Sequence, residues 1–471
     1  MHVRALVHMH TCDPQLHTES LAQPRAVEGY LDEFSADALS SVQQAAVAAG
    51  KPAESLSLRE IGQALFGRRN VDPGGPSEFD ILEPLMQCNT MSYKDSIKIE
   101  AHLAQRSGPT RIIDVAIGDG QSVILWKNMK ARWPFRYARW LIGVGGFHEH
   151  AHTMFGLNEM FFYALVAWCL AVMGITKVFM VTKDLEHNNY AHVQQAHHAI
   201  VIAIVAYLLQ DVTSPPPALF LRSPTLYLQQ VQHASGEVLL MYLRFAGFVI
   251  LQWQRAAREA DGLKLKKLFA YSHHVFRSVC HKPVCAQISL IALLGFCCAL
   301  PALQKVLLAT VSLSLLGRLG SNMYTDRILE YINMLQQGSK RSANAASFGR
   351  SLDLTTLLRP MMHVRHAFQA SETGAAQSDD PVTENMLRMA RLLQDALVQT
   401  IGCDLTLYCP SNLMWHTGNA VPLYTGDFRY RRPWEWIWRV AFGRSCGKHR
   451  SRHEMWHAFA ERFVDERLFP F

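Results

Sequence analysis

The chain has 471 residues, of which 49% are apolar and 18% charged, and 46 basic against 39 acidic residues give a net charge of +7. Such a chain has enough apolar residues for a large core, and its length suggests two or three domains. The mild net charge excludes nucleic-acid binding through bulk charge, so a nucleic-acid partner would need a local basic patch. The low content of charged residues keeps a membrane protein as an alternative.

The N-terminal stretch predicts no secretory signal, because "MHVRALVHMHTCDPQ" has His and Arg where a signal peptide has its apolar core. The ten cysteines show no regular spacing. We therefore expect reduced thiols in an intracellular protein, with the nucleus as one alternative.

The first predicted elements are two short helices, 35–50 and 56–67, with Gly50 ending the first. A third helix is predicted over 93–108. Next comes "RIIDVAIGD" (111–119), whose Val, Ile and Ala residues indicate a buried strand. An amphipathic helix (122–133) and a second apolar run (140–150) follow. Strand, helix and strand predict an α/β unit with a parallel pair.

From about 157 to 335 the pattern is mostly helical and apolar. The segments 160–176 and 283–304 carry no charged residue and approach the 18 to 20 residues that cross a bilayer. Glycine and proline interrupt them, which favours buried core helices over membrane spans. The segment 197–210 is shorter than a span.

The domain organisation that we predict has five parts. They are an N-terminal helical and irregular segment (1–75), the first part of an α/β core (76–156), an apolar helical insertion (157–320), an acidic helix that completes the core with a linker (321–370), and a C-terminal helix with a basic aromatic tail (371–471).

Asp119, in "IGDGQ", follows the predicted strand directly. Open α/β sheets place ligands at the carboxyl ends of their strands, and the flanking Gly118 and Gly120 permit a sharp turn. A carboxylate there suits a hard cation such as magnesium. A turn residue that caps the next helix is an equally good interpretation.

A second acidic group lies in "TDRILEYINMLQQG" (325–338). Asp326, Glu330 and Asn333 share one helical face, opposite an apolar stripe. This face would suit a metal ligand set, but a solvated face of an amphipathic helix is the simpler interpretation.

The segment "GGFHEHAHTMFG" alternates His148, His150 and His152 with Glu149 between the first two. The three histidines share a face if the segment is extended and do not if it is helical. We weigh a zinc site, a histidine that supports a carboxylate site, and ordinary polar residues at a helix start.

The tail 428–453 interleaves basic and aromatic residues, with Glu435 as its one acidic residue. Arginine neutralises phosphate and aromatic rings stack on bases, although an interfacial membrane helix or a solvated helix face has the same composition. The residues predicted to bind nucleic acid are Arg431, Arg432, Trp434, Trp436, Lys448 and Arg450. The sequence holds no P-loop, GxGxxG or GxSxG motif, and we expect no small-molecule cofactor.

The order of these features resembles a transposon-associated family, domain-of-unknown-function family 6589 (DUF6589), over about residues 75–350. The segments that carry the resemblance are "FDILEPLMQCNTMSYKDSIKIEAHL", "RIIDVAIGDGQSVILWKNMKARWPFRYARWL", "GVGGFHEHAHTMFG", "HNNYAHVQQAHHAIV" and "TDRILEYINMLQQGSKR". The resemblance implies an α/β ribonuclease-H-like core with a large, mostly α-helical insertion, and a predominantly helical chain overall.

The resemblance also implies residue roles. Asp119 would be the first metal-binding carboxylate and Glu330 the last, with Asp326 nearby and His148 near the middle position, around magnesium ions that act on DNA. Neither Glu149 nor Asp184 matches the middle acidic position cleanly, which would fit an inactive copy.

We therefore expect a transposase-derived protein that cleaves or joins DNA strands with magnesium, or an inactive DNA-binding remnant of one. A polytopic helical membrane protein and a non-catalytic nucleic-acid-binding module are the alternatives.

Overall fold

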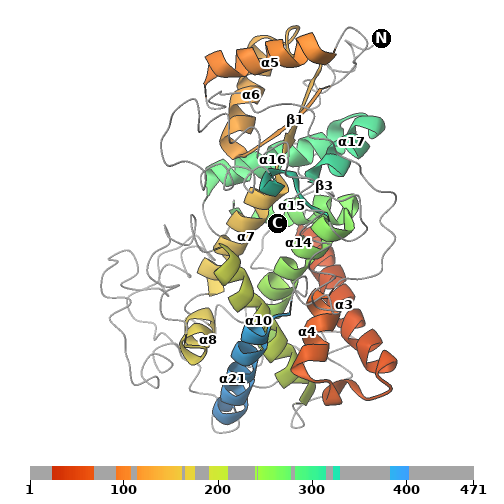
Figure 1. Ribbon diagram of the computed structural model, residues 1–471, viewed down its shortest axis with the longest axis vertical. Helices are drawn as coiled ribbons and strands as arrows, with labels where there is room; N and C mark the ends of the chain where they lie inside the picture. The colour runs from red at the N-terminus through yellow and green to blue at the C-terminus, as the bar shows by residue number, and fades with distance from the viewer. Residues whose placement is uncertain are drawn as a thin grey trace, which may run out of the picture.

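The computed structural model describes residues 24–67, 92–107, 114–161, 165–174, 190–210, 239–240, 242–276, 282–313, 322–328 and 382–401. Helix accounts for 82% of the interpretable residues. The α/β unit lies toward one end of the molecule, and the helices α4, α10 and α21 lie toward the other (Figure 1).

The predicted strand–helix–strand unit is present. Strand β1 (Asp114–Gly118) pairs in parallel with β2 (Trp140–Val144), and α6 (Gly120–Arg132) connects them. The register joins Asp114 to Trp140 and Gly118 to Val144. Both strands therefore end at the same edge, which places the start of α6 beside the start of the helix that follows β2.

Helices cover both faces of this pair. A Cβ built on Gly118 would lie 2.8 Å from the ring of Trp126 in α6, and one on Gly143 would lie 3.5 Å from Leu307 in α17 (Pro301–Val311). Neighbouring positions on a strand face opposite sides, and Gly143 is paired with Ile117 rather than Gly118. The two helices consequently pack on opposite faces.

The remaining elements of this end are short or peripheral. Helix α5 (Tyr93–Ser107) lies beside α6, and α16 (Pro283–Cys298) packs on β2. Strands β3 (Ser312–Leu313) and β4 (Met323–Tyr324) form an antiparallel pair. The ribonuclease-H-like core is not established by these described strands and stays a proposal.

The two predicted N-terminal helices are present as α3 (Pro24–Ala48) and α4 (Leu58–Phe66), with the short helix η1 (Ala53–Ser55) between them. Helix α3 begins eleven residues before the predicted start at residue 35. Gly50 follows α3 with a φ of +62°, a conformation that glycine adopts without strain. Ser57 and Glu60 form a reciprocal capping box at the start of α4.

Two arginines of a helix about 190 residues later in the chain bond the C-terminus of α4. Helix α14 (Phe248–Glu259) places the buried Arg255 so that its guanidinium donates to Leu65 O at 3.0 Å and Ala64 O at 2.9 Å. Arg258 donates to Phe66 O at 2.8 Å. These bonds satisfy carbonyl groups that a helix leaves unpaired at its C-terminus.

One hydrophobic cluster runs from Val27 in α3 to Leu397 in α21 (Glu384–Ile401). Its centre is α10 (Tyr190–Gln210), which packs against α4 and α21. The other contributing elements are α6, β2, α7 (Gly146–Phe161), α8 (Ala167–Val172), η4 (Leu243–Gly247), α14, α15 (Gly262–His274), α16, α17 and β4.

One of the apolar segments considered as spans is divided into two shorter helices. The segment 283–304 breaks between α16 and α17, whereas 160–176 lies only partly within the described residues, with α7 reaching Phe161 and α8 covering Ala167–Val172. The segment 197–210 belongs to a longer helix than its apolar part suggested, because α10 begins at Tyr190. In the described part of the chain, Val193–Gln210 is the single stretch long and apolar enough to cross a membrane, and 83% of it is buried, as in the core helix of many folded proteins.

Candidate functional site

Asp119 ends β1 and begins α6. Its Oδ1 accepts a hydrogen bond from Ser122 N at 2.9 Å, so the residue is the N-cap of α6. The helix-capping interpretation is therefore confirmed. The side chain is exposed, and its second oxygen has no hydrogen-bond partner within the described ranges. The cap thus leaves one carboxylate oxygen accessible for a ligand.

The ladder between the two strands continues one residue beyond them. Gly145 N donates to Gly118 O at 3.1 Å, which holds the turn after β1 beside the turn after β2. The exposed carboxylate of Asp119 consequently stands next to the N-terminus of α7.

A second carboxylate, that of Asp326, is docked on this N-terminus. Asp326 Oδ1 accepts from Phe147 N at 2.8 Å, and Oδ2 accepts from His148 N at 3.0 Å. His148 Nδ1 also lies 3.0 Å from Oδ2. Acidic groups are stabilised at helix N-termini, where backbone N–H groups lack partners. Asp326 therefore acts as a cap supplied from about 180 residues away.

The Gly145–Gly146 pair makes this approach possible. A Cβ on Gly145 would lie 2.3 Å from the carboxyl group of Asp326, and one on Gly146 would lie 2.5 Å from the ring of Tyr324. Any side chain at either position would displace the segment that carries Asp326. The two glycines lie within the apolar run predicted over 140–150, and their packing role appears only in the structure.

The prediction that Asp326 belongs to a solvated helix face is wrong. The residue is 2% exposed, because its carboxylate is enclosed by the backbone of α7 and by His148. The amphipathic pattern could not reveal this, since the partner of Asp326 lies in a distant segment. The pairing of Asp326 with His148, two residues that the family resemblance placed in one site, is present.

Glu149 is buried against α16, where Ser289 Oγ contacts its Oε1. Burial, and to a smaller extent the negative charge of Asp326, raise the pKa of Glu149 to about 8, although the bond from Ser289 opposes the rise. The side chain is accordingly protonated at neutral pH. Glu149 thus lies in the core beside α16, and whether it fills the middle acidic position stays untested.

The three histidines lie on a helix, and they do not share one face. His150 is enclosed, with its ring stacked on Trp253 at 5.6 Å and its Nδ1 3.1 Å from Tyr190 Oη. Burial lowers the pKa of His150 to about 3. Where the structure describes the chain, no group of three or more His, Cys, Asp or Glu residues could hold a metal ion, and the zinc interpretation has no support there.

Two tyrosines and an arginine complete this cluster and were not singled out in the sequence as site residues. Tyr324 Oη donates to Trp253 O at 2.5 Å, and the guanidinium of Arg327 lies 5.6 Å from the ring of Phe147 and 5.8 Å from that of Tyr190. Burial raises the pKa of Tyr190 to about 12. The position of Tyr190 in "HNNYAHVQQ" was the signal available for it.

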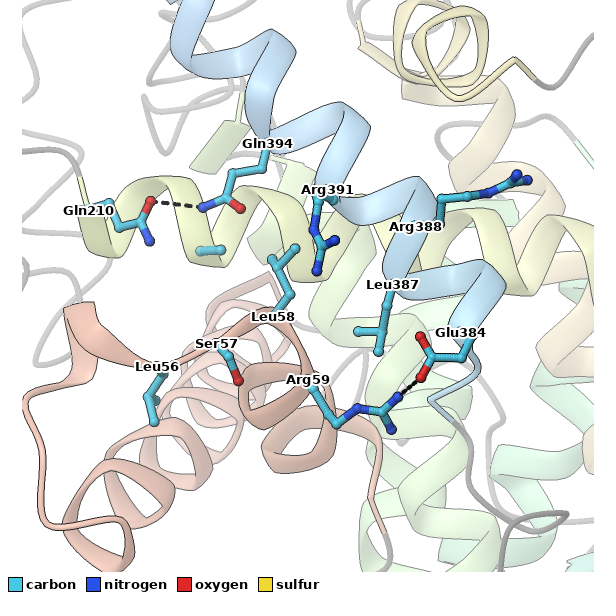
Figure 2. A pocket seen from close by; sticks show the side chains of 11 residues that line it. Leu56, Ser57, Leu58, Arg59, Gln210, Glu384, Leu387, Arg388, Arg391 and Gln394 are labelled. Atoms are coloured by element: carbon cyan, nitrogen blue, oxygen red, sulfur yellow. Dashed lines mark hydrogen bonds and ion pairs between the residues drawn. The ribbon is translucent and has the colours of Figure 1, made fainter.

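A separate pocket lies at the other end of the molecule, between α4, α10 and α21 (Figure 2). It has a volume of about 370 Å³. Arg59 forms an ion pair with Glu384, and Gln394 Nε2 donates to Gln210 Oε1 at 2.8 Å across it. Most of its polar groups therefore join neighbouring helices, and none of the predicted site residues lines it.

Several predicted site residues fall outside the described part of the chain. They are Glu330, Asn333 and Asp184, and the tail residues Arg431, Arg432, Trp434, Trp436, Lys448 and Arg450. The predicted ligand pair of Asp119 and Glu330 is therefore untested. No protein-family model, no curated protein and no solved structure matches the chain.

Proposed function

We propose that the shared carboxyl edge of β1 and β2 is a centre for cleaving or joining DNA strands, of the transposase-derived kind that the family resemblance implies. The observation that carries the proposal is the bond from Gly145 N to Gly118 O. It sets the exposed carboxylate of Asp119 beside the capped start of α7, at the edge where open α/β sheets hold ligands.

Asp119 fits a magnesium ion in its chemistry. Magnesium usually takes one or two carboxylates and fills its octahedron with waters and substrate phosphates. The free oxygen of Asp119 supplies one such ligand, whereas both oxygens of Asp326 are already engaged. The second carboxylate in this proposal is Glu330. When bound, the cation would activate water or a 3′-hydroxyl and stabilise the leaving oxygen.

Asp326 and His148 are positioning residues in this proposal. The carboxylate of Asp326 fixes the first turn of α7 against the segment after β4, and His148 Nδ1 completes its shell. The loop between β2 and α7 is thereby held in place beside Asp119. A rigid backbone near the ligand is what a metal-dependent site needs.

The test compares Asp119→Asn with Asp261→Asn in the full chain. Asp261 caps α15 as Asp119 caps α6, through a bond from Lys264 N at 2.9 Å. Asparagine caps a helix about as well as aspartate, so both variants keep their caps and lose one negative charge. The assay is cleavage of a labelled DNA oligonucleotide in magnesium and in manganese.

We expect D119N to lose metal-dependent cleavage and D261N to retain it. Equal cleavage by both variants would remove Asp119 from the site. A wild-type chain that binds DNA and shows no cleavage with either metal would contradict the enzyme and favour the inactive DNA-binding remnant.

A further inference from the structure

Every charged residue between Gly120 and His148 is basic. This segment contains five basic residues and no aspartate or glutamate: Lys127, Lys130, Arg132, Arg136 and Arg139. Within this segment the balance is therefore five positive charges against none. This concentration exceeds what the net charge of +7 over 471 residues would suggest.

The end of α6 and the turn that leads to β2 present aromatic rings among these arginines, and we call residues 131–139 the 131–139 turn. Phe135 is 87% exposed, the largest exposure of any large apolar side chain in the described residues. Trp133 is half-buried, and Tyr137 is buried against Trp140 at 5.2 Å. The turn is thus anchored by Tyr137 and holds the ring of Phe135 in solvent.

The arginines of the turn, at positions 132, 136 and 139, are also exposed. The guanidinium of Arg132 lies 5.1 Å from the ring of Trp133, and that of Arg136 lies 5.7 Å from the ring of Tyr137. A cation–π contact uses the face of a guanidinium group, whereas its N–H groups point outward along its edges. Lys130 differs, because its Nζ donates to Trp140 O and stabilises the turn.

We propose that the 131–139 turn is a binding surface for single-stranded nucleic acid, with Phe135 as the base-stacking ring and Arg132, Arg136 and Arg139 as the phosphate contacts. Single strands are bound where basic groups follow the backbone and aromatic rings accept bases. Guanidinium groups match phosphate oxygens better than ammonium groups do. One isolated exposed ring offers little apolar area for insertion into a bilayer, which favours nucleic acid over a lipid surface.

The surface lies away from the proposed centre. Helix α6 has 13 residues and joins Asp119 at its start to the turn at its end, which corresponds to about 20 Å along its axis. The binding function does not require cleavage, and it can be measured separately from it.

The experiment is a fluorescence-anisotropy titration of the full chain against a fluorescein-labelled oligothymidylate, without divalent metal. Phe135→Ala is compared with Leu263→Ala, whose side chain is 70% exposed beside the lysines of α15. The triple variant R132A/R136A/R139A is compared with Arg391→Ala, an exposed arginine of α21. Thermal unfolding of each variant checks that the fold is kept, which the exposure of Phe135 favours.

We expect F135A to weaken binding roughly 5- to 100-fold with an unchanged salt dependence, because it removes stacking alone. The triple variant should lower the slope of log K against log salt by about 2, since each phosphate contact on a single strand contributes about 0.7. L263A and R391A should bind as the wild type does.

Equal affinities of F135A and L263A for the oligonucleotide would overturn the proposal. The proposal would also be overturned if F135A lost binding to vesicles containing 30% phosphatidylserine while it bound the oligonucleotide as the wild type does. That result would assign the turn to membranes. The two proposals fail separately, because D119N tests cleavage with the turn intact, and the turn variants test binding with Asp119 intact.

Discussion

Replacing Asp326 by asparagine tests whether this buried carboxylate holds the first turn of α7. Asparagine keeps the shape and one acceptor oxygen, but it turns an NH₂ group toward a backbone N–H or toward His148. One hydrogen bond to a charged group is lost, at about 1.5 to 3 kcal/mol. The interaction of the negative charge with the helix N-terminus is lost as well, at about 0.5 to 2 kcal/mol. We expect D326N to lower the free energy of unfolding by about 2 to 5 kcal/mol.

The assay is urea unfolding followed by tryptophan fluorescence, which reports on the buried Trp253 close to Tyr324. The change should appear in the midpoint with the denaturant dependence unchanged. Asp261→Asn is the matched control, because its cap at the start of α15 faces one N–H group, and we expect it to cost less than about 0.5 kcal/mol.

A loss for D326N below about 1 kcal/mol, or one equal to that of D261N, would refute the reasoning. It would mean that the contacts of Asp326 with Phe147 N and His148 do not hold the turn in solution. Gly145→Ala provides an independent perturbation of the same contact, since its Cβ would lie 2.3 Å from the carboxyl group of Asp326.

Three further predictions concern buried polar groups. Because the pKa of Glu149 is raised to about 8, this side chain ionises above pH 4.5 in the unfolded chain and stays protonated in the folded chain. The free energy of unfolding should therefore fall by several kcal/mol between pH 4.5 and 8. Glu149→Gln should flatten this part of the plot of urea midpoint against pH, and a plot parallel to that of the wild type would contradict the burial argument. The pKa of His197, lowered to about 3 by burial, has the opposite effect. The contribution of the neutral His197 to the free energy of unfolding is fully present above pH 6.5 and is lost as the pH falls from 6.5 to 3. In the same urea measurement, His197→Gln should lose less stability than the wild type over that pH range. Arg255→Met should cost about 3 to 5 kcal/mol, because the carbonyl groups of Ala64 and Leu65 and the carboxylate of Asp37 lose a buried cationic partner; thermal unfolding that matches the wild type would show that water replaces the guanidinium.

The local elements were predictable from the sequence because their causes are local. The apolar run before Asp119 and the amphipathic pattern after it define β1 and α6, and Gly50 marks the end of α3. Each of these signals lies within one turn or one strand of the feature that it determines. The type of each of these elements, helix or strand, could therefore be predicted from the pattern of neighbouring residues.

The candidate site was predictable in part, because its contacts are long-range. The sequence identified Asp119 and His148, and the structure brings His148 to Asp326. Asp326 is buried where the segment after β4 meets α7, and Glu149 is buried where α7 meets α16. No periodicity within these segments encodes either meeting. Buried acidic residues look like solvated ones until their partners are known.

The attachment of α4 to α14 has a consequence for the order in which the chain folds. The guanidinium of Arg255 bonds the carbonyl of Leu65, 190 residues earlier, and α10 is covered by α21, which begins at Glu384. Closing such long loops before their contacts form is entropically costly and slows folding. During synthesis, the α10 face that packs on α21 would therefore emerge from the ribosome well before its cover, and a chain stalled ahead of α21 would present that face to chaperones.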